Sequence, residues 1–388
     1  MSAIKENNPR CYGCGACESI CPKKAITLVP DYETFLYPRI DQKKCVQCGL
    51  CEKTCPLNYD AFFPYQSVQS FAGIHRFSEV VYNSSSGGAF TALYEVYIQK
   101  GYKIYGVRYD ENLNVVFGSA LSEEECARFR KSKYVQSDYN DCYSNVSKDL
   151  QDGLKVLFSG TSCQCAALSK YLDTKRISDS NLVMVNVLCH GVPSQTIFHS
   201  YLESMEKAES SKIIQYTFKN KKTNSDAVNT RTAYVQFDNG HEYIRTSKDD
   251  AFLRGYYRRL FYRPSCYSCQ FARKDRISDI TIADAWNIEK INEKMNPAEG
   301  VSLILFNTEK SKEIIRDIKD KMKLEQVGLD WVFSSQDLFI RPTAIHKNRE
   351  RFFKEWHEYG IEKAVFRCTK TPWTDKIIHF LKKKVGKR

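Results

Sequence analysis

The chain has 388 residues, of which 42% are hydrophobic and 27% are charged, so it is long enough for two or three globular domains. No apolar run approaches the roughly 20 residues that span a bilayer, and the N-terminus MSAIKENNPR lacks the apolar core of a signal peptide. We therefore expect a cytoplasmic protein. In a reducing compartment its 16 cysteines indicate metal or redox chemistry, because structural disulfides belong mainly to oxidising compartments.

Two cysteine runs near the N-terminus share one spacing. They are CYGCGACESICP (residues 11–22) and CVQCGLCEKTCP (residues 45–56), each a C-x2-C-x2-C-x3-C-P pattern. In bacterial ferredoxins three thiolates of such a run hold one 4Fe–4S cluster, and the fourth reaches across to the other cluster. Zinc knuckles are a poor alternative, because a zinc site closes with four ligands and has no use for this interleaving. We assign the first cluster to Cys11, Cys14, Cys17 and Cys55, and the second to Cys45, Cys48, Cys51 and Cys21.

The cysteine runs predict a ferredoxin-like domain over residues 1–60, followed by a linker over residues 61–75. A larger domain is expected over residues 76–360, and residues 361–388 form a basic tail. Nearly all of the net charge of +12 belongs to the part of the chain after residue 60. A basic face suits an acidic electron carrier or an anionic cofactor, and a merely solvated surface is the alternative. Nothing resembles a helix-turn-helix, an RNP motif or a zinc finger, so we expect no nucleic-acid partner.

The segment NSSSGGAFTALYEVYIQKG (residues 83–101) predicts a hydroxyl-rich loop that opens a helix, whose apolar residues recur with helical spacing. The loop N–H groups and the helix N-terminus suit a phosphate or pyrophosphate. Helix capping without a ligand would use the same residues. The segment RKSKYVQSD (residues 130–138) combines cations with an aromatic side chain that could flank a flavin and its phosphates, although a solvated basic loop would look similar. These residues are Lys131, Lys133, Tyr134 and Gln136.

Two apolar runs later in the chain predict buried strands of a mixed α/β domain. Residues 156–158 precede a Ser-Gly-Thr-Ser loop and a helical pattern, and residues 182–188 end at a Cys-His-Gly sequence. Cys163 and Cys189 therefore both lie just past the carboxyl ends of predicted central strands. Open α/β sheets bind their ligands at this edge.

Cys266 and Cys269 form a C-x2-C pair that has no second pair near it. A closed tetrahedral site or a cubane cluster needs four ligands, so two are missing. Cys163 and Cys189 are the best candidates to complete the set, with either a 4Fe–4S cluster or zinc as the occupant. Taken singly, each would more often be a small buried hydrophobe. We interpret the other four cysteines as structural: Cys126, Cys142, Cys165 and Cys368.

Six separated segments give the sequence a family resemblance. They are SSSGGAFTAL, SKYVQSD, VLFSGTSCQ, LVMVNVLCHGVPS, RPSCYSCQFARKDRISDITIADAW and GVSLILFNT. Together they resemble, in order, the coenzyme F420 hydrogenase/dehydrogenase beta-subunit family, here preceded by a dicluster ferredoxin module. The resemblance implies an FAD enzyme with a further 4Fe–4S cluster. Such an enzyme passes electrons between iron–sulfur centres and a deazaflavin such as coenzyme F420, or another two-electron acceptor.

The resemblance also assigns residues by position. The family's cysteine motifs fall on Cys163, Cys189, Cys266 and Cys269. The flavin-binding segments fall on Ser85, Ser86, Gly87, Gly88, Lys133, Tyr134, Gln136 and Thr161. The sequence departs from the family where Ser162 replaces a proline. It departs again where two glycines and an aromatic residue are replaced by Ala283, Ala285 and Asn287.

The expected fold is α+β, with a bacterial-type dicluster ferredoxin domain before a larger mixed α/β flavin-binding domain. Electrons would pass from a ferredoxin or a partner subunit to the N-terminal clusters, the third cluster, FAD and a small-molecule acceptor. His190, next to Cys189, is a candidate proton relay, and tuning of the cluster through a local hydrogen bond is the alternative. A non-catalytic electron-transfer subunit of a larger complex and a zinc-stabilised binding protein are the alternative functions.

The last residues, WTDKIIHFLKKKVGKR, can form a short helix with an apolar side and a basic side. Such a helix could lie on an anionic membrane surface or bind an acidic partner, which leaves peripheral membrane contact possible. A frayed, solvated terminus is the alternative, because isolated helices of this length are marginal. The residues concerned are Ile377, Ile378, Phe380, Leu381, Lys382, Lys383, Lys384, Lys387 and Arg388.

Overall fold

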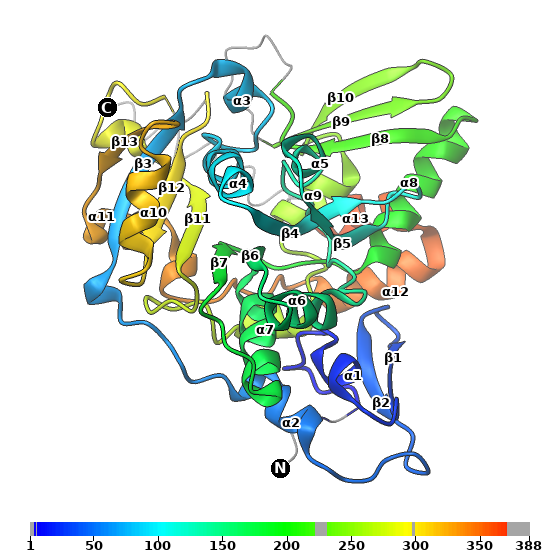
Figure 1. Ribbon diagram of the computed structural model, residues 1–388. Helices are drawn as coiled ribbons and strands as arrows, with labels where there is room; N and C mark the ends of the chain where they lie inside the picture. The colour runs from blue at the N-terminus through cyan, green and yellow to red at the C-terminus, as the bar shows by residue number, and fades with distance from the viewer. Residues whose placement is uncertain (1–3, 5, 222–230, 297–298, 371–388) are drawn as a thin grey trace.

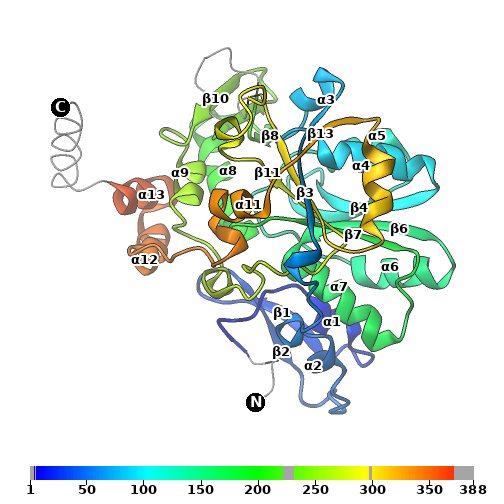
Figure 2. The ribbon, with the colours of Figure 1, turned by 90° about the vertical axis from the view of Figure 1, so that its left-hand side faces the viewer.

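The computed structural model describes residues 4, 6–221, 231–296 and 299–370. Its N-terminal part is a small unit built from a β-hairpin and two single-turn helices (Figures 1 and 2). Strands β1 (Ile26–Pro30) and β2 (Leu36–Ile40) pair antiparallel. Helices α1 (Ala16–Ile20) and α2 (Leu50–Thr54) each begin after a glycine in the left-handed region, Gly15 and Gly49. The duplicated cysteine runs thus fold into duplicated turns, as expected for a ferredoxin-like module.

The larger part is organised around an eight-stranded mixed sheet, in the order β13-β3-β12-β11-β7-β6-β4-β5. Strands β4, β6, β7 and β11 are parallel to their neighbours in this group, and the outer strands pair antiparallel. The strands are β3 (Gln69–His75), β4 (Tyr102–Tyr109), β5 (Val115–Ala120), β6 (Lys155–Thr161), β7 (Leu182–Val187), β11 (Ile280–Asp284), β12 (Ser302–Phe306) and β13 (Met322–Gln326).

Helices cover both faces of this sheet. Helices α4 (Ala89–Gln99) and α10 (Ser311–Ile318) share one apolar core with the sheet, to which Val183 and Val185 contribute. Helices α6 (Cys142–Gln151) and α7 (Ser162–Lys175) pack on the other face, against alternate residues such as Met184. Because both faces are covered, β6 and β7 are nearly continuous apolar runs. Short helices α3 (Ser78–Tyr82), α5 (Glu123–Ala127) and α11 (Leu329–Ser335) lie around the sheet.

A second core lies beside the main sheet (Figure 1). A three-stranded antiparallel sheet, in the order β10-β9-β8, packs there against four helices. The strands are β8 (Ile213–Phe218), β9 (Thr232–Phe237) and β10 (Glu242–Thr246). The helices are α8 (Gln195–Glu209), α9 (Ala251–Tyr257), α12 (Arg349–Tyr359) and α13 (Ile361–Thr369).

The ferredoxin-like unit packs directly on the larger part. The Tyr143 hydroxyl of α6 donates to the Cys14 carbonyl (3.0 Å). The hydroxyls of Thr34, in the β1–β2 turn, and Ser194, the N-cap residue of α8, form a hydrogen bond of 2.6 Å. The two parts therefore share a polar and apolar interface, in which α1 packs against α6 and α7 and α2 packs against α7.

Several elements lie where the sequence predicted them. The expected strands and helices correspond to β6, α7, β7 and α4. Residues 69–75, placed in the linker by sequence, instead form β3 between β12 and β13. The tail expected from residue 361 begins with the buried helix α13, and its basic end lies outside the described residues. No helix among the described residues is both long and apolar enough to cross a membrane.

Candidate functional site

The four cysteines assigned to the first ferredoxin cluster lie close together. Burial raises the pKa of the Cys14 thiol, and the neighbouring thiols of Cys17, Cys55 and Cys11 raise it further. Burial likewise raises the pKa of Cys17, and the Cys11 and Cys55 thiols have the largest further effect. Neighbouring thiolates repel one another, which keeps the free thiols protonated. A bound metal cation removes this repulsion and stabilises the thiolate form. Cys55 and Cys51 of the second run both raise the pKa of Cys17, so the second run lies near the first, and the interleaved assignment of Cys55 stays a prediction.

The second run is more open to solvent. Cys48 is exposed, Cys45 and Cys51 are half-buried, and the loop residue Val46 is 57% exposed. Burial raises the pKa of the Cys51 thiol, and Cys48 is among the groups that raise it further. Cys21 and Cys51 both pack against the small apolar cluster that contains Cys17 and Cys55. Cys21 of the first run and Cys51 of the second run thus pack against the same small cluster, and the assignment of Cys21 to the second site stays a prediction.

The structure also brings together the four cysteines proposed for a third site. Cys163 lies in the first turn of α7 directly after β6, and Cys189 follows β7, its parallel neighbour in the sheet. Cys266 lies in the 3₁₀ helix η3 (Pro264–Ser268), and Cys269 ends it. Burial raises the pKa of Cys189 first, and the thiols of Cys266, Cys163 and Cys269 raise it further. All four cysteines line one small cavity.

The remaining described cysteines are not among those assigned to the three sites. Cys126, Cys142, Cys165 and Cys368 are buried, and the Cys165 thiol donates to the Gly160 carbonyl (3.6 Å). Within the described ranges, no group of three or more His, Cys, Asp or Glu side chains is arranged to hold a single metal ion. The third site is thus defined by its shared cavity and by the mutual influence of its thiols.

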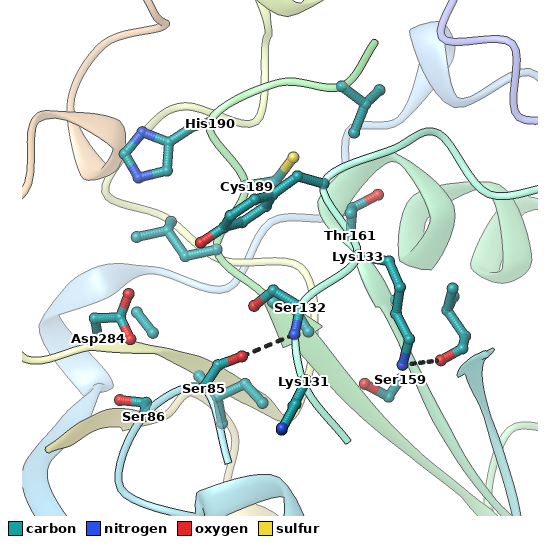
Figure 3. Close-up of a pocket in the computed structure, with 18 of the residues that line it drawn as sticks. Ser85, Ser86, Lys131, Ser132, Lys133, Ser159, Thr161, Cys189, His190 and Asp284 are labelled. Atoms are coloured by element: carbon teal, nitrogen blue, oxygen red, sulfur yellow. Dashed lines mark hydrogen bonds between the residues drawn. The ribbon is translucent and has the colours of Figure 1, made fainter. Parts of the chain in front are cut away.

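A much larger cavity adjoins the third cysteine site. Its volume is about 580 Å³, within the range of small-molecule and cofactor sites. Thr161, Cys163, Cys189 and His190 line both cavities, so the two share a wall. Three loops converge on the larger cavity (Figure 3). They are the serine loop (residues 83–88), the lysine loop (residues 130–138) and the Cys189 loop (residues 188–194). The flavin residues implied by the resemblance that line it are Ser85, Ser86, Gly88, Lys133, Tyr134, Gln136 and Thr161.

The serine loop is fixed by its own hydrogen bonds. The Ser85 hydroxyl accepts from the Ser132 N–H (2.8 Å), which ties the serine loop to the lysine loop (Figure 3). The Ser86 hydroxyl donates to the Val301 carbonyl (2.7 Å). Gly87 lies beneath the cavity, where its N–H donates to the Ser302 hydroxyl (3.0 Å). A Cβ there would lie 2.3 Å from the Gly73 carbonyl oxygen, so Gly87 allows a close approach of two backbones.

Lys133 is held inside the wall of the cavity. Its ammonium donates to three backbone carbonyls, those of Val107 (2.9 Å), Arg128 (3.1 Å) and Arg130 (2.8 Å). Burial lowers the pKa of Lys133 to about 7, and nearby Lys131 acts in the same direction. The hydrogen bonds to the three carbonyls tie the loop together next to the cavity and favour the ammonium form of Lys133 against the effect of burial.

Tyr134 and Gln136 face different neighbours. The Tyr134 ring stacks on Tyr256 at 4.3 Å, which gives the cavity an aromatic wall. The Gln136 amide donates to the Tyr12 and Gly13 carbonyls, both at 3.0 Å. Gln136 therefore also touches the first ferredoxin loop, a contact that no sequence motif predicts.

His190 and Asp284 both line the cavity and lie on the same side of it in Figure 3. Protein atoms around the His190 ring lower its pKa, and Lys219 is the next influence, although the residue is exposed to solvent. The role of His190 as a proton relay stays a prediction. Lys219 forms an ion pair with Asp284. Sequence reasoning missed several lining residues that carry no motif: Lys219, Arg231, Tyr256, Tyr257, Arg259 and Trp286.

Comparison with known families matched two parts of the chain. Residues 10–59 match the model for a 4Fe-4S dicluster domain. Residues 153–330 match the model for the C terminus of the coenzyme F420 hydrogenase/dehydrogenase beta subunit. Both matches fall on motifs quoted from the sequence. Among curated proteins, none matched the chain.

Solved structures similar to this chain include one from the F420-reducing NiFe hydrogenase complex of Methanosarcina barkeri, studied with xenon. The two chains share 15% sequence identity, with a TM-score of 0.48. The match covers 78% of this chain and 95% of that chain.

Proposed function

Because this chain joins a 4Fe–4S dicluster domain to the C-terminal domain of the coenzyme F420 hydrogenase/dehydrogenase beta-subunit family, we propose an iron–sulfur flavoprotein function. It passes electrons between ferredoxin-type clusters and a two-electron acceptor through FAD. One observation supports this proposal most directly. The third cysteine site and the large cavity share a wall that includes Thr161, Cys163, Cys189 and His190.

The cysteine sites fit iron–sulfur clusters by their donors. Each proposed site offers four thiols, the ligands that such clusters use. The third site is enclosed: burial raises the pKa of Cys266 to about 12 and that of Cys269 to about 11. Iron binds the deprotonated thiolates, so binding of a cluster must offset the cost of removing these protons.

The large cavity fits FAD by its size and its polar groups. The serine loop supplies hydroxyls and the start of α4, which suit phosphate oxygens. The Lys133 amine is held in the wall by backbone carbonyls, and Tyr134 and Tyr256 offer aromatic surface. When bound there, FAD supplies the exchange between one-electron carriers and a two-electron substrate. The residues of this chain bind it, orient it and limit access of water.

The acceptor would bind at the mouth of the cavity, beyond His190. Lys219, Arg231 and Arg259 all line this region and influence the His190 imidazole. A deazaflavin of the F420 type, or another small molecule that carries two electrons, is the proposed acceptor. At the other end, a ferredoxin or a redox partner subunit would contact the exposed loop of the second run.

The test is cofactor analysis of anaerobically purified protein. We expect about 12 iron atoms, arising from three 4Fe–4S clusters, and about one FAD per chain. Cys266→Ser and Cys269→Ser should each remove one cluster and keep the ferredoxin-type signal. Cys165→Ser and Cys368→Ser are the matched controls, because both thiols are buried outside the third site.

Two outcomes would contradict the proposal. Iron near eight atoms with about one zinc would make the third site a zinc site. A chain that binds no flavin under any redox condition would exclude the FAD assignment. Flavin-dependent turnover of a small acceptor by the isolated chain would favour an enzyme over a non-catalytic electron-transfer subunit.

A further inference from the structure

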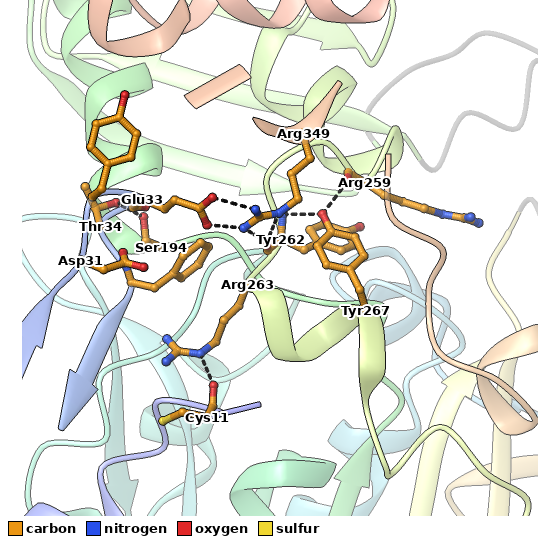
Figure 4. Close-up of polar contacts among 12 residues, drawn as sticks. Cys11, Asp31, Glu33, Thr34, Ser194, Arg259, Tyr262, Arg263, Tyr267 and Arg349 are labelled. Carbon is orange, nitrogen blue, oxygen red and sulfur yellow. Dashed lines mark hydrogen bonds and ion pairs between the residues drawn. The ribbon is translucent and has the colours of Figure 1, made fainter. Parts of the chain in front are cut away.

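The first ferredoxin site and the third cysteine site are joined by one buried arginine. Arg263 directly precedes the 3₁₀ helix that carries Cys266, and it is 1% exposed. Its carbonyl accepts from the Cys266 N–H (2.9 Å), so its backbone belongs to the third site. Its side chain reaches the first run, where Nε donates to the Cys11 carbonyl at 2.6 Å (Figure 4), and the residue also lines the small cavity of the third site.

The other contacts of Arg263 are also with neutral groups. One terminal nitrogen donates to the Leu36 carbonyl (2.8 Å) and the other to the Gln136 side-chain oxygen (3.3 Å). The guanidinium lies over the Tyr37 ring, 4.5 Å from its centroid. These carbonyl, amide and ring partners hold the cation without cancelling its charge. Burial strengthens the field of such a cation, because little solvent screens it.

A second side chain crosses the same boundary in the opposite direction. Tyr12 lies between Cys11 and Cys14 in the first run, yet its ring packs against Phe271, just past Cys269 (5.4 Å between centroids). Its hydroxyl accepts from the Gln270 N–H (3.3 Å). Tyr12 also lines the small cavity of the third site. Each site thus sends one side chain into the loop of the other.

Gly13 shows how closely the two loops approach. Its φ is +60°, and a Cβ there would lie 2.5 Å from an Arg263 terminal nitrogen and 2.8 Å from the Gln136 amide nitrogen. Only glycine leaves room for this contact without strain. The first cysteine loop therefore packs directly on the Arg263 side chain, with no room for a side chain at residue 13.

We propose that Arg263 is a positioning residue that fixes the first and third sites against each other and raises the reduction potential of both clusters. This inference rests on the proposed function, because it requires a cluster at each site. Reduction adds one negative charge to a cluster, and a buried cation beside it stabilises that reduced state. No proton transfer is needed for this effect.

The test is a redox titration monitored by electron paramagnetic resonance on the anaerobic, cluster-loaded full chain. Arg263→Gln removes the charge and keeps a hydrogen-bonding side chain, so both potentials should become more negative while the iron content stays at the parent level. Arg263→Lys keeps the charge, so its potentials should remain near those of the parent. Arg341→Gln is the matched control, because Arg341 lies in an exposed ion pair, and it should shift neither potential.

Unchanged potentials in a fully loaded Arg263→Gln protein would overturn the proposal, as would equal shifts in the Lys and Gln variants. If the Gln variant loses iron, Arg263→His decides the matter. Its potentials should fall as the pH rises and the imidazole loses its charge, beyond any change in the parent. A pH response identical to that of the parent would reject an electrostatic role.

The metal content of the parent protein tests the proposed function on its own. About eight iron atoms together with zinc would mean that the third cluster is absent. The reduction potential of the first cluster would still test the role of Arg263.

Discussion

Arg349 donates hydrogen bonds through both terminal nitrogens to the Glu33 carboxylate, although 316 residues separate the two in sequence (Figure 4). The side chains are only 7% and 19% exposed. Arg349 also donates to the Tyr262 carbonyl, through Nε at 3.2 Å and Nη2 at 3.0 Å. The β1–β2 turn is therefore clamped to α12 next to the loop that leads to the third cysteine site.

Glu33→Ala should weaken this clamp, because it leaves a buried guanidinium without its counter-ion. Breaking one side of a buried ion pair typically costs about 3–5 kcal/mol. We expect a lower unfolding temperature and faster proteolytic cleavage in the β1–β2 hairpin. Asp337→Ala is the control: it breaks the exposed pair with Arg341, whose side chains are 68% and 63% exposed, and should cost less than about 1 kcal/mol. Equal losses in the two variants would show that the Glu33 pair does not hold the domains together.

Gly87→Ala should disrupt the serine loop. The added methyl group would lie 2.6 Å from the Ser302 nitrogen and closer still to the Gly73 carbonyl, and such overpacking costs about 1–3 kcal/mol. We expect lower thermal stability and reduced FAD content, measured on the same preparation. Gly328→Ala is the matched change, because a Cβ at Gly328 meets nothing within 4 Å. Full FAD retention in Gly87→Ala would mean that the loop is not part of the flavin site.

Asp250→Asn should make the protein more stable at neutral pH. Asp250 is fully buried, accepts from the Tyr201 hydroxyl (2.8 Å) and caps α9 through the Leu253 N–H (2.8 Å). Burial raises its pKa to about 6, so the folded state holds the proton more tightly than the unfolded chain. The stability gained from this proton is present below the ordinary aspartate pKa and is lost as the pH rises through about 6.

Asparagine keeps the acceptor without a charge. Denaturant unfolding at pH 7.5 should therefore favour the variant by up to about 3 kcal/mol, with the difference shrinking toward pH 4. Asp249→Asn, one residue away and exposed, should show no such gain. A pH-independent difference between Asp250→Asn and the parent would contradict this account.

Lys43→Glu should slow reduction by an acidic ferredoxin. Lys43 is exposed in the loop of the second cysteine run, two residues before Cys45. Reversing its charge should lower the association rate and weaken its dependence on salt. Reduction by dithionite, a small reductant, should not change. Lys290→Glu, at the exposed end of the 3₁₀ helix Ile288–Lys290, is the control, and an equal loss there would indicate only a general effect of net charge.

Local patterns predicted β6, β7, α7 and α4, because each has a continuous apolar run or a helical repeat that can be identified without knowing its tertiary partners. Strand β3 was assigned to a linker. Its sequence, QSFAGIH, mixes polar and small residues, and its partners β12 and β13 come from the far end of the domain. Nothing local marks such a strand, since its pairing energy depends on contacts that sequence spacing does not reveal.

The cysteines of the candidate site could be found because thiols are few and their spacing carries chemistry. Arg263 and Tyr12 could not, because arginine and tyrosine are common and their partners lie in distant loops. The sequence did carry a signal for the backbone conformation of Asn287. Asn287 stands where the family has glycine, and its φ of 61° lies in the left-handed region, which asparagine tolerates better than most residues.

The placement of the third cysteine site has a consequence for how the protein is made. The eight ferredoxin cysteines emerge early in synthesis, within residues 11–55, and their loops are local in sequence. The third set spans residues 163–269 and meets only after β6 and β7 have paired and the turn at Pro264–Ser268 has closed over them. Such non-local contacts form late and slowly. Iron–sulfur loading should therefore proceed in two stages, with the ferredoxin-like clusters inserted first and the inner site last.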